Sequence, residues 1–191
     1  SSFNAINKIK KNFSINKIGH AGTLDPLAEG ILPIAIGGTT KLVKFISNQN
    51  KVYRFTINWG TQTSTDDSEG DIIFSSNIIP SLKDIISNLK EYSGFINQEP
   101  PKASAIKING KRAYKLFREQ KDFRVESRKV FIKYIKIVDH KKTGTTFEVE
   151  CGKGFYIRSL ARDFANKLGT YGHISALERL KVGKFDKESS I

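Results

Sequence analysis

The sequence has 191 residues, a mass of 21.4 kDa, a formal net charge of +13 and a single cysteine. A chain of this length can bury a sufficient core without a disulfide or a metal, and 38% hydrophobic residues exclude wholesale disorder. No run approaches about 18 apolar residues, which excludes a transmembrane helix. One cysteine excludes an internal disulfide and a cysteine-rich zinc site.

The positive charge indicates the class of partner. Lys and Arg number 32 against 19 Asp and Glu, which favours a polyanion, with nucleic acid ahead of an acidic membrane surface. The alternative is an ordinary lysine-rich solvated surface. One cysteine and the lack of an apolar leader at the first residues predict a cytoplasmic protein. The sequence contains no methionine, so we expect a fragment of a longer protein.

The first third of the chain combines short helices with a glycine-rich loop. Apolar residues near a 3.6-residue period predict a helix over 3–13. Three glycines and a proline predict an irregular loop over 18–30. A buried strand over 31–36 and a helix over 40–47 follow. Strict alternation over 51–59 is the strongest strand signal in the sequence.

The rest of the chain mixes strands and helices without regular alternation, which predicts an α+β fold. Segment 60–70 is polar and loop-like, and Ser81 begins a capping box. Asn109-Gly110 is a turn signal. The expected helices are 81–92, 111–120 and 158–168, and the expected strands are 130–138 and 145–151, joined at 141–144.

Asp25 is the most conspicuous candidate for chemistry. The following Pro26 disfavours helical backbone at Asp25, so the carboxylate is presented from an extended, fixed segment. An aspartate before proline also commonly starts a turn, and this is the alternative role. Nearby His20 is a candidate general base, a packed loop residue or a stacking surface for a nucleic-acid base.

A second candidate constellation covers residues 151–158. Tyr156 and Arg158 lie two apart, which on an extended segment places them on one side. An arginine here can hold a carboxylate ionised or bind phosphate bidentately; the alternative is a structural ion pair beside a packed tyrosine. Cys151 alternates with apolar residues and is expected to be a buried small residue. The histidine spacing predicts no metal site.

Taken together, these segments resemble the TruB-type tRNA pseudouridine-55 synthase family. Residues 19–33 resemble the signature around its catalytic aspartate, and 51–55 the strand with its active-site tyrosine. The other matching segments follow in family order over nearly the whole chain: 60–70, 100–114, 153–158 and 172–180.

The resemblance implies a single catalytic domain over 1–191, with a mixed, largely antiparallel sheet flanked by helices. It also implies an RNA-gripping insertion at about 99–125, and indicates that an N-terminal segment and a C-terminal PUA-like domain are missing. The implied reaction isomerises uridine 55 in the tRNA T-arm to pseudouridine. The product is an isomer, so no cofactor or metal is expected. The expected partner is the T-arm stem-loop of tRNA, bound by a monomer without membrane contact.

The resemblance also implies roles for individual residues. Asp25 is the covalent catalyst, Arg158 holds it ionised, Tyr53 stacks on the uracil and Tyr156 lines the pocket. The target base leaves its stack, His20 fills the vacated space and Leu177 closes the apolar wall. The substrate-binding set is His20, Leu177, Lys153, Lys107, Lys111 and Arg112.

Two other functions remain alternatives at this point. A non-catalytic RNA-binding protein could use the same scaffold. A glycosidase would need a second catalytic carboxylate, for which Glu29 and Asp163 are candidates. The residues do not decide whether Asp25 attacks C1′ of the ribose or C6 of the uracil, nor which group accepts the proton from C5.

Overall fold

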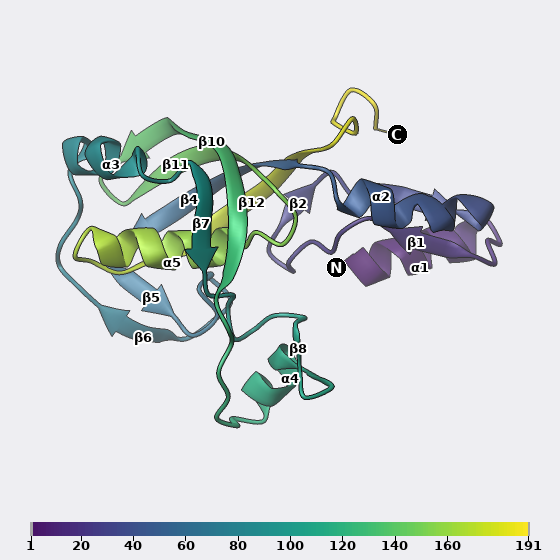
Figure 1. The fold of residues 1–191 in the computed structure, drawn as a ribbon, viewed down its shortest axis with the longest axis horizontal. Coiled ribbons are helices and arrows are strands. Elements are labelled where there is room, and N and C mark those ends of the chain that lie inside the picture. Colours follow the sequence, from purple (N-terminus) through teal and green to yellow (C-terminus); the bar gives the residue numbers. More distant parts are fainter. Residues whose placement is uncertain (1, 191) are drawn as a thin grey trace.

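A six-stranded sheet is the centre of the fold in the computed structural model, which describes residues 2–190 (Figure 1). Every neighbouring pair is antiparallel except β2 and β12, which are parallel. The α+β prediction and the largely antiparallel sheet are therefore confirmed. In spatial order the strands are β2 (Glu29–Gly30), β12 (Gly172–Val182), β4 (Lys51–Trp59), β11 (Gly144–Cys151), β10 (Arg128–Lys141) and β7 (Gly94–Gln98).

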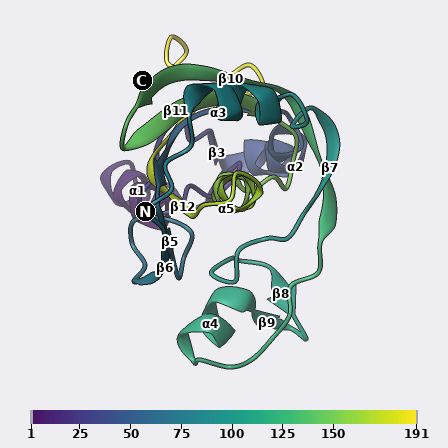
Figure 2. The ribbon, with the colours of Figure 1, turned by 90° about the vertical axis from the view of Figure 1, so that its left-hand side faces the viewer.

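The core lies between this sheet and helix α5 (Ile157–Lys167), which the curved sheet wraps in Figure 2. The predicted alternation of β4 is confirmed, since Phe55 and Trp59 are buried on the face toward α5. Phe164 of α5 meets Phe147 of β11 edge to face, with ring centroids 6.0 Å apart. Such aromatic contacts stabilise by more than burial alone, so they fix α5 against the sheet.

Helix α3 (Leu82–Leu89) begins as the sequence predicts. The Ser81 hydroxyl accepts a hydrogen bond from the Asp84 backbone N–H at 3.2 Å, which satisfies one of the unpaired donors of the first turn. Ile85 is fully buried in the core. The helix ends three residues earlier than predicted.

A small N-terminal lobe lies at the right of Figure 1. The predicted first helix is confirmed, whereas the predicted strand over 31–36 is shorter and the predicted helix over 40–47 splits in two. Gly37 adopts a positive φ of 62° where the strand ends, and the chain then enters a 3₁₀ turn. The elements are α1 (Ser2–Asn12), β1 (Ile18–His20), β3 (Ile34–Ile36), η1 (Gly37–Leu42) and α2 (Val43–Ser47).

The insertion at about 99–125 protrudes from the sheet between β7 and β10 (Figures 1 and 2). Asn109 and Gly110 both have positive φ, 48° and 80°, as a two-residue hairpin turn requires. The predicted helix starts later than expected, because its first two residues pair with the preceding strand instead. The insertion contains β8 (Lys107–Ile108), β9 (Lys111–Arg112) and α4 (Ala113–Arg118).

Several strands escaped prediction. β12 has register shifts after Ile174 and Arg179, so its burial lacks the period of two that β4 shows from Phe55 to Trp59. The segment expected to be a polar loop contains β5 (Thr61–Thr63), which pairs with β6 (Ile72–Ser75). The hairpin turn expected at 141–144 is tighter, because β10 extends to Lys141 and β11 starts at Gly144. Among residues 2–190, no helix has the length and apolar character needed to cross a membrane.

Candidate active site

Asp25 and Arg158 form a bidentate ion pair. The Arg158 Nε donates to Oδ2 of Asp25 at 2.9 Å, and Nη2 donates to Oδ1 at 3.0 Å. Arg158 is 4% exposed, whereas the Asp25 side chain is 31% exposed. A fork-to-fork pair of this kind fixes the carboxylate plane. Arg158 thus holds one side of the Asp25 carboxylate, and the other side is accessible from solvent.

Arg158 is itself immobilised by neighbouring groups. Its Nη1 donates to the Thr65 carbonyl oxygen at 3.0 Å, and both terminal nitrogens lie 3.3 Å from the Ala103 carbonyl oxygen. A second carboxylate, Asp67, places Oδ2 3.6 Å from Nη1 and is 3% exposed. Asp67 was not predicted as a site residue, although it lies in the motif stretch 60–70.

The loop that carries Asp25 is fastened on both sides of the aspartate. Before it, the Leu24 backbone N–H donates to the Ser2 hydroxyl at 2.9 Å. After it, Gly30 has a φ of +97°, and a Cβ there would lie 2.3 Å from the Arg179 carbonyl oxygen. Only glycine permits this close approach of two backbones. Gly30 therefore determines the path of the chain as it leaves the site.

A cavity of about 690 Å³ opens beside the ion pair. Asp25, Arg158 and Tyr156 line it from the body of the protein. The N-terminal lobe contributes residues such as Phe3 and His20, and the insertion contributes residues such as Tyr114 and Phe117. The site therefore lies where three parts of the chain meet. Its volume suits a bound nucleotide.

Tyr156 and His20 line this cavity, as the sequence suggested, but Tyr156 does so for a different reason. Tyr156 has extended backbone and Arg158 is already helical, because α5 starts at Ile157. The turn from strand to helix, and not strand alternation, brings both toward the cavity. The Arg128 guanidinium lies 5.0 Å from the Tyr156 ring centroid. Buried His20 Nδ1 has no hydrogen-bond partner within residues 2–190.

Tyr53 and Leu177 are not among the residues that line the cavity. Leu177 is 6% exposed and pairs with Phe55 in the sheet. Burial raises the pKa of Tyr53 to about 12, with smaller contributions from the thiol and carboxyl groups nearby, while Arg179 opposes the rise. The Tyr53 phenol is therefore neutral at physiological pH. Their roles in substrate binding stay predictions.

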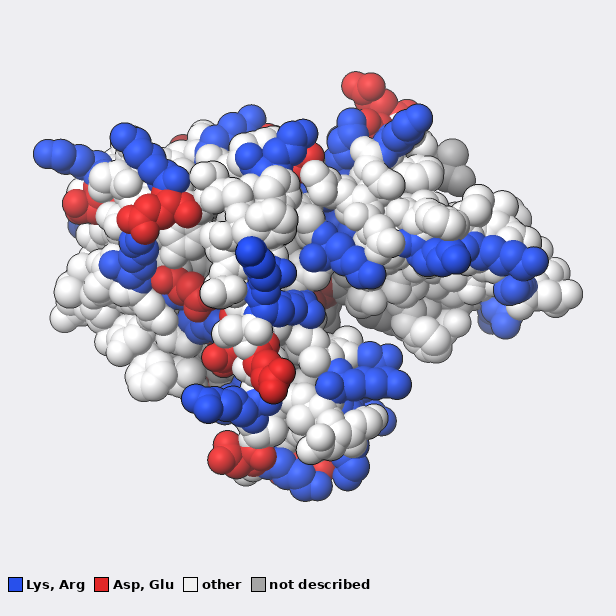
Figure 3. Space-filling view, viewed as in Figure 1, with Lys and Arg blue, Asp and Glu red and all other residues white. Residues whose placement is uncertain are grey.

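The predicted RNA-contacting cations lie apart from the ion pair and are exposed. Lys107, Lys111 and Arg112 are on the hairpin of the insertion, and Lys153 is on the turn before α5. The Arg112 side chain donates to the Ala105 carbonyl oxygen, so its direction is set within the insertion. Figure 3 shows Lys and Arg side chains on the insertion and on the N-terminal lobe.

The carboxylates considered for a glycosidase do not join the site. Glu29 and Asp163 are not among the residues lining the cavity around Asp25. Asp163 instead accepts from Arg162 Nε at 2.9 Å. No group of three or more His, Cys, Asp or Glu residues suited to a metal ion occurs within residues 2–190.

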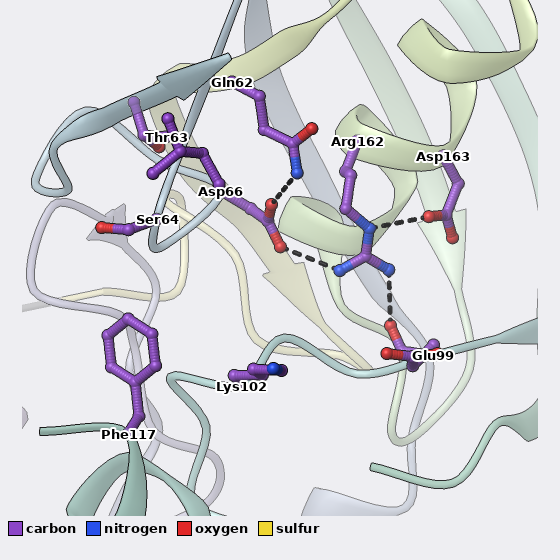
Figure 4. Close-up of a pocket in the computed structure, with 10 residues that line it drawn as sticks. Gln62, Thr63, Ser64, Asp66, Glu99, Lys102, Phe117, Arg162 and Asp163 are labelled. Atoms are coloured by element: carbon purple, nitrogen blue, oxygen red, sulfur yellow. Dashed lines mark hydrogen bonds and ion pairs between the residues drawn. The ribbon is translucent and has the colours of Figure 1, made fainter. Parts of the chain in front are cut away.

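A second cavity of about 510 Å³ borders the same helix (Figure 4). Arg162 donates to Asp66 at 2.9 Å, to Asp163 at 2.9 Å and to the Glu99 carbonyl oxygen at 2.8 Å. Gln62 completes the coordination of Asp66. Burial raises the pKa of Asp66, and the guanidinium opposes the rise. These polar groups satisfy one another's hydrogen-bonding capacity, and their contacts hold the 61–70 segment against α5 one turn beyond Arg158.

Solved structures share this fold. A chain of the Cbf5-Nop10-Gar1 complex matches with a TM-score of 0.74 and 28% identity, covering 97% of this chain and 46% of that one. A chain of an H/ACA RNP bound to a substrate RNA containing 2′-deoxyuridine matches with a TM-score of 0.72 and 25% identity, covering 97% and 45%. The chain therefore has the fold of the matching chains in these two structures.

Sequence comparison identifies the family. The model for the TruB family pseudouridylate synthase N-terminal domain matches residues 10–157, and the chain belongs to this family. tRNA pseudouridine synthase B of Mesorhizobium japonicum is 48% identical over 190 residues, covering 100% of this chain and 58% of the relative. The Brucella anthropi protein of the same name is 50% identical over 191 residues, covering 100% and 59%. The chain thus spans less than two thirds of these relatives.

Proposed function

We propose that the full-length protein converts uridine 55 in the T-arm of tRNA to pseudouridine. The observation that carries the proposal is the bidentate Asp25–Arg158 pair at the wall of a nucleotide-sized cavity. Family membership supports the reaction class, and the relatives named above carry the name tRNA pseudouridine synthase B. We further propose that the protein acts as a cytoplasmic monomer.

In this reaction the C1′–N1 bond breaks, a C1′–C5 bond forms, C5 loses its proton and N1 gains one. A carboxylate is a suitable covalent catalyst for such a sequence. Each oxygen of Asp25 accepts one hydrogen bond from Arg158, which leaves lone pairs for attack on C1′ or C6. No oxidant, metal or cofactor is needed, because substrate and product are isomers.

Arg158 supports catalysis through geometry as well as charge. Its guanidinium holds the Asp25 carboxylate in one orientation, because carbonyl oxygens and Asp67 leave the guanidinium little freedom to turn. A group that is fixed before substrate arrives does not have to be reorganised during the reaction. Tyr156, at the start of the same helix, forms the adjoining wall.

The target base must leave its stack to reach this wall. We propose that His20 occupies the vacated space, that Tyr53 stacks on the uracil and that Leu177 closes the apolar wall. The exposed cations of the insertion, together with Lys153, would contact the RNA backbone, where charge neutralisation gives sequence-independent affinity. Such contacts place the stem-loop without taking part in the chemistry.

The alternative is a non-catalytic RNA-binding protein. Binding an anionic ligand does not need a partly exposed carboxylate in the wall of the cavity, and like charges would oppose it. The buried contacts that fix Arg158 to Asp25 therefore favour an enzyme.

The test is to incubate full-length protein with unmodified tRNA transcript and map pseudouridine. The proposal expects one modified position, U55, and no product from a transcript carrying cytidine there. Pseudouridine at other positions would contradict the proposed specificity, and tight binding without product would favour the binding protein.

A further inference from the structure

Arg179 of β12 is among the largest fully buried side chains, with 1% exposure. Its guanidinium donates to backbone carbonyl oxygens, and within residues 2–190 it has no carboxylate partner. The distances are 2.8 Å from Nε to Ile31 O, 3.0 Å from Nη2 to Gly22 O and 3.5 Å from Nη1 to Thr23 O. Burying a cation without an ionic partner is costly. This arrangement therefore needs a reason beyond filling the core.

All three acceptors belong to the loop that carries Asp25. Gly22 and Thr23 precede the aspartate, and Ile31 follows it, so one guanidinium joins the two arms of the loop. The backbone of Arg179 also holds the loop, because its carbonyl oxygen accepts a hydrogen bond from the Ile31 N–H at 2.8 Å. We call these side-chain and backbone contacts of Arg179 with Gly22, Thr23 and Ile31 the Arg179 clasp. The glycine at position 30 allows this contact, as described above.

Arg179 also contacts a second predicted site residue. It pairs with Tyr53 across the β12–β4 ladder, and its positive charge opposes the rise that burial causes in the pKa of the phenol. One buried side chain thus connects the nucleophile loop to the tyrosine predicted to stack on the base. Arg158 holds the Asp25 carboxylate itself, whereas Arg179 holds the backbone from which that carboxylate extends.

We infer that Arg179 is a positioning residue, which fixes the Asp25 loop and Tyr53 relative to each other before RNA binds. The inference rests on the proposed function, since the positions matter only if Asp25 attacks a nucleotide. A planar fork can serve carbonyl oxygens on two separate segments, and an ammonium on a flexible stem cannot reproduce that geometry. Lysine at this position keeps the charge and loosens the loop.

The experiment compares full-length wild type with Arg179→Lys and Arg179→Met. Val182→Ala is the matched control, because Val182 is buried on the same strand and lies outside the site. Three quantities are measured: the single-turnover rate on saturating tRNA, the Kd for tRNA, and hydrogen exchange of peptides covering 22–31 and 144–151.

We expect Arg179→Lys to lose at least tenfold in rate with Kd within twofold, and Arg179→Met to lose more. Exchange should accelerate in 22–31 and stay unchanged in 144–151. Val182→Ala should lower the melting temperature while its rate stays within twofold. A lysine variant within twofold of the wild-type rate would overturn the inference, as would equal acceleration of exchange in both peptides.

Gly30→Ala disrupts the Arg179 clasp by changing the loop and leaving Arg179 unchanged. It therefore keeps the test decisive if the Arg179 variants do not fold. Its Cβ would displace the loop from the Arg179 backbone, so it should show the same loss of rate and the same local exchange. Normal rate and exchange in Gly30→Ala would contradict the clasp. If wild type makes no pseudouridine, the proposed function fails, while hydrogen exchange still reports whether Arg179 orders the loop.

Discussion

The Asp25 loop and the insertion at 99–125 both line the cavity beside the Asp25–Arg158 pair, but they are held by opposite means. Arg158 and Arg179, both nearly inaccessible, bind the Asp25 loop through its carboxylate and its carbonyl oxygens. The insertion has two-residue strands, one six-residue helix and exposed cations. Chemistry needs groups fixed to fractions of an ångström, whereas phosphate contacts need only charge within reach.

The two regions meet at Arg158. Its Nη1 and Nη2 donate to the carbonyl oxygen of Ala103, at the base of the insertion. The buried contacts that order the Asp25 side of the cavity thus extend to the root of the insertion. Variants in the two regions should consequently separate turnover from binding.

The largest effect is expected for Asp25→Asn. The amide matches the carboxylate in shape but lacks its nucleophilicity, so the single-turnover rate should fall by about 10⁴-fold or more. Binding of tRNA should stay within about threefold, because uniform binding comes from the phosphate contacts. Rate, Kd and melting temperature are measured together. A rate within tenfold of wild type would show that Asp25 is not the nucleophile.

Arg158→Lys should lower the rate by about 10²–10³-fold, since it keeps the charge but loses the fork that orients Asp25. Binding of tRNA should change little. The matched control is Arg54→Lys, at an exposed arginine of β4 that pairs with Glu148 at 3.5 Å, and its rate should stay within about twofold. Full activity of Arg158→Lys would show that only the positive charge at this position matters, and not the planar fork of arginine.

Removing the insertion cations should have a smaller effect, of a different kind. Each phosphate contact contributes about 0.7–0.9 to the slope of log affinity against log salt. The triple variant Lys107→Gln, Lys111→Gln, Arg112→Gln loses three such contacts, so its slope should be shallower by about 2–3. KM should rise while kcat stays constant, because these contacts are equal in the ground and transition states.

A control of equal charge change is available on β10. Lys133, Lys136 and Lys141 are exposed and pair with carboxylates at 3.1, 2.8 and 3.5 Å. Replacing these three with glutamine should alter the salt slope less than the insertion variant does. Equal slopes in the two variants would mean that the insertion contributes only general positive charge.

The smallest effect concerns thiol reactivity. Burial raises the pKa of Cys151 on β11 to about 12, so hardly any thiolate forms at pH 8 and iodoacetamide should not modify the folded protein. Denaturant should make Cys151 reactive. A cysteine introduced by Ala105→Cys, at an exposed position in the insertion, should react in the folded state. Modification of Cys151 at the same rate would contradict the rigid core.

Local patterns predicted those parts of the fold whose causes lie within a few residues. The alternation of β4, the Ser81 cap and the Asn109-Gly110 turn all depend on near neighbours, and all are confirmed. The motifs likewise indicated Asp25 and Arg158 before any geometry was known. Their spacing does not reveal the bidentate contact, which joins residues 133 positions apart.

Tertiary structure alone decided the features that depend on distant segments. In the sequence, nothing distinguishes Arg179 from the other cations of a basic chain. It is buried because β12 passes beside the Asp25 loop, where it contacts Ile31, a residue 148 positions earlier. Asp67 gains its role only when the 61–70 segment folds onto α5. The sequence by itself thus determined the chemical groups and the local turns, since these depend on residue type and neighbours. Burial and the partners of each charge depend on the packing of the whole chain.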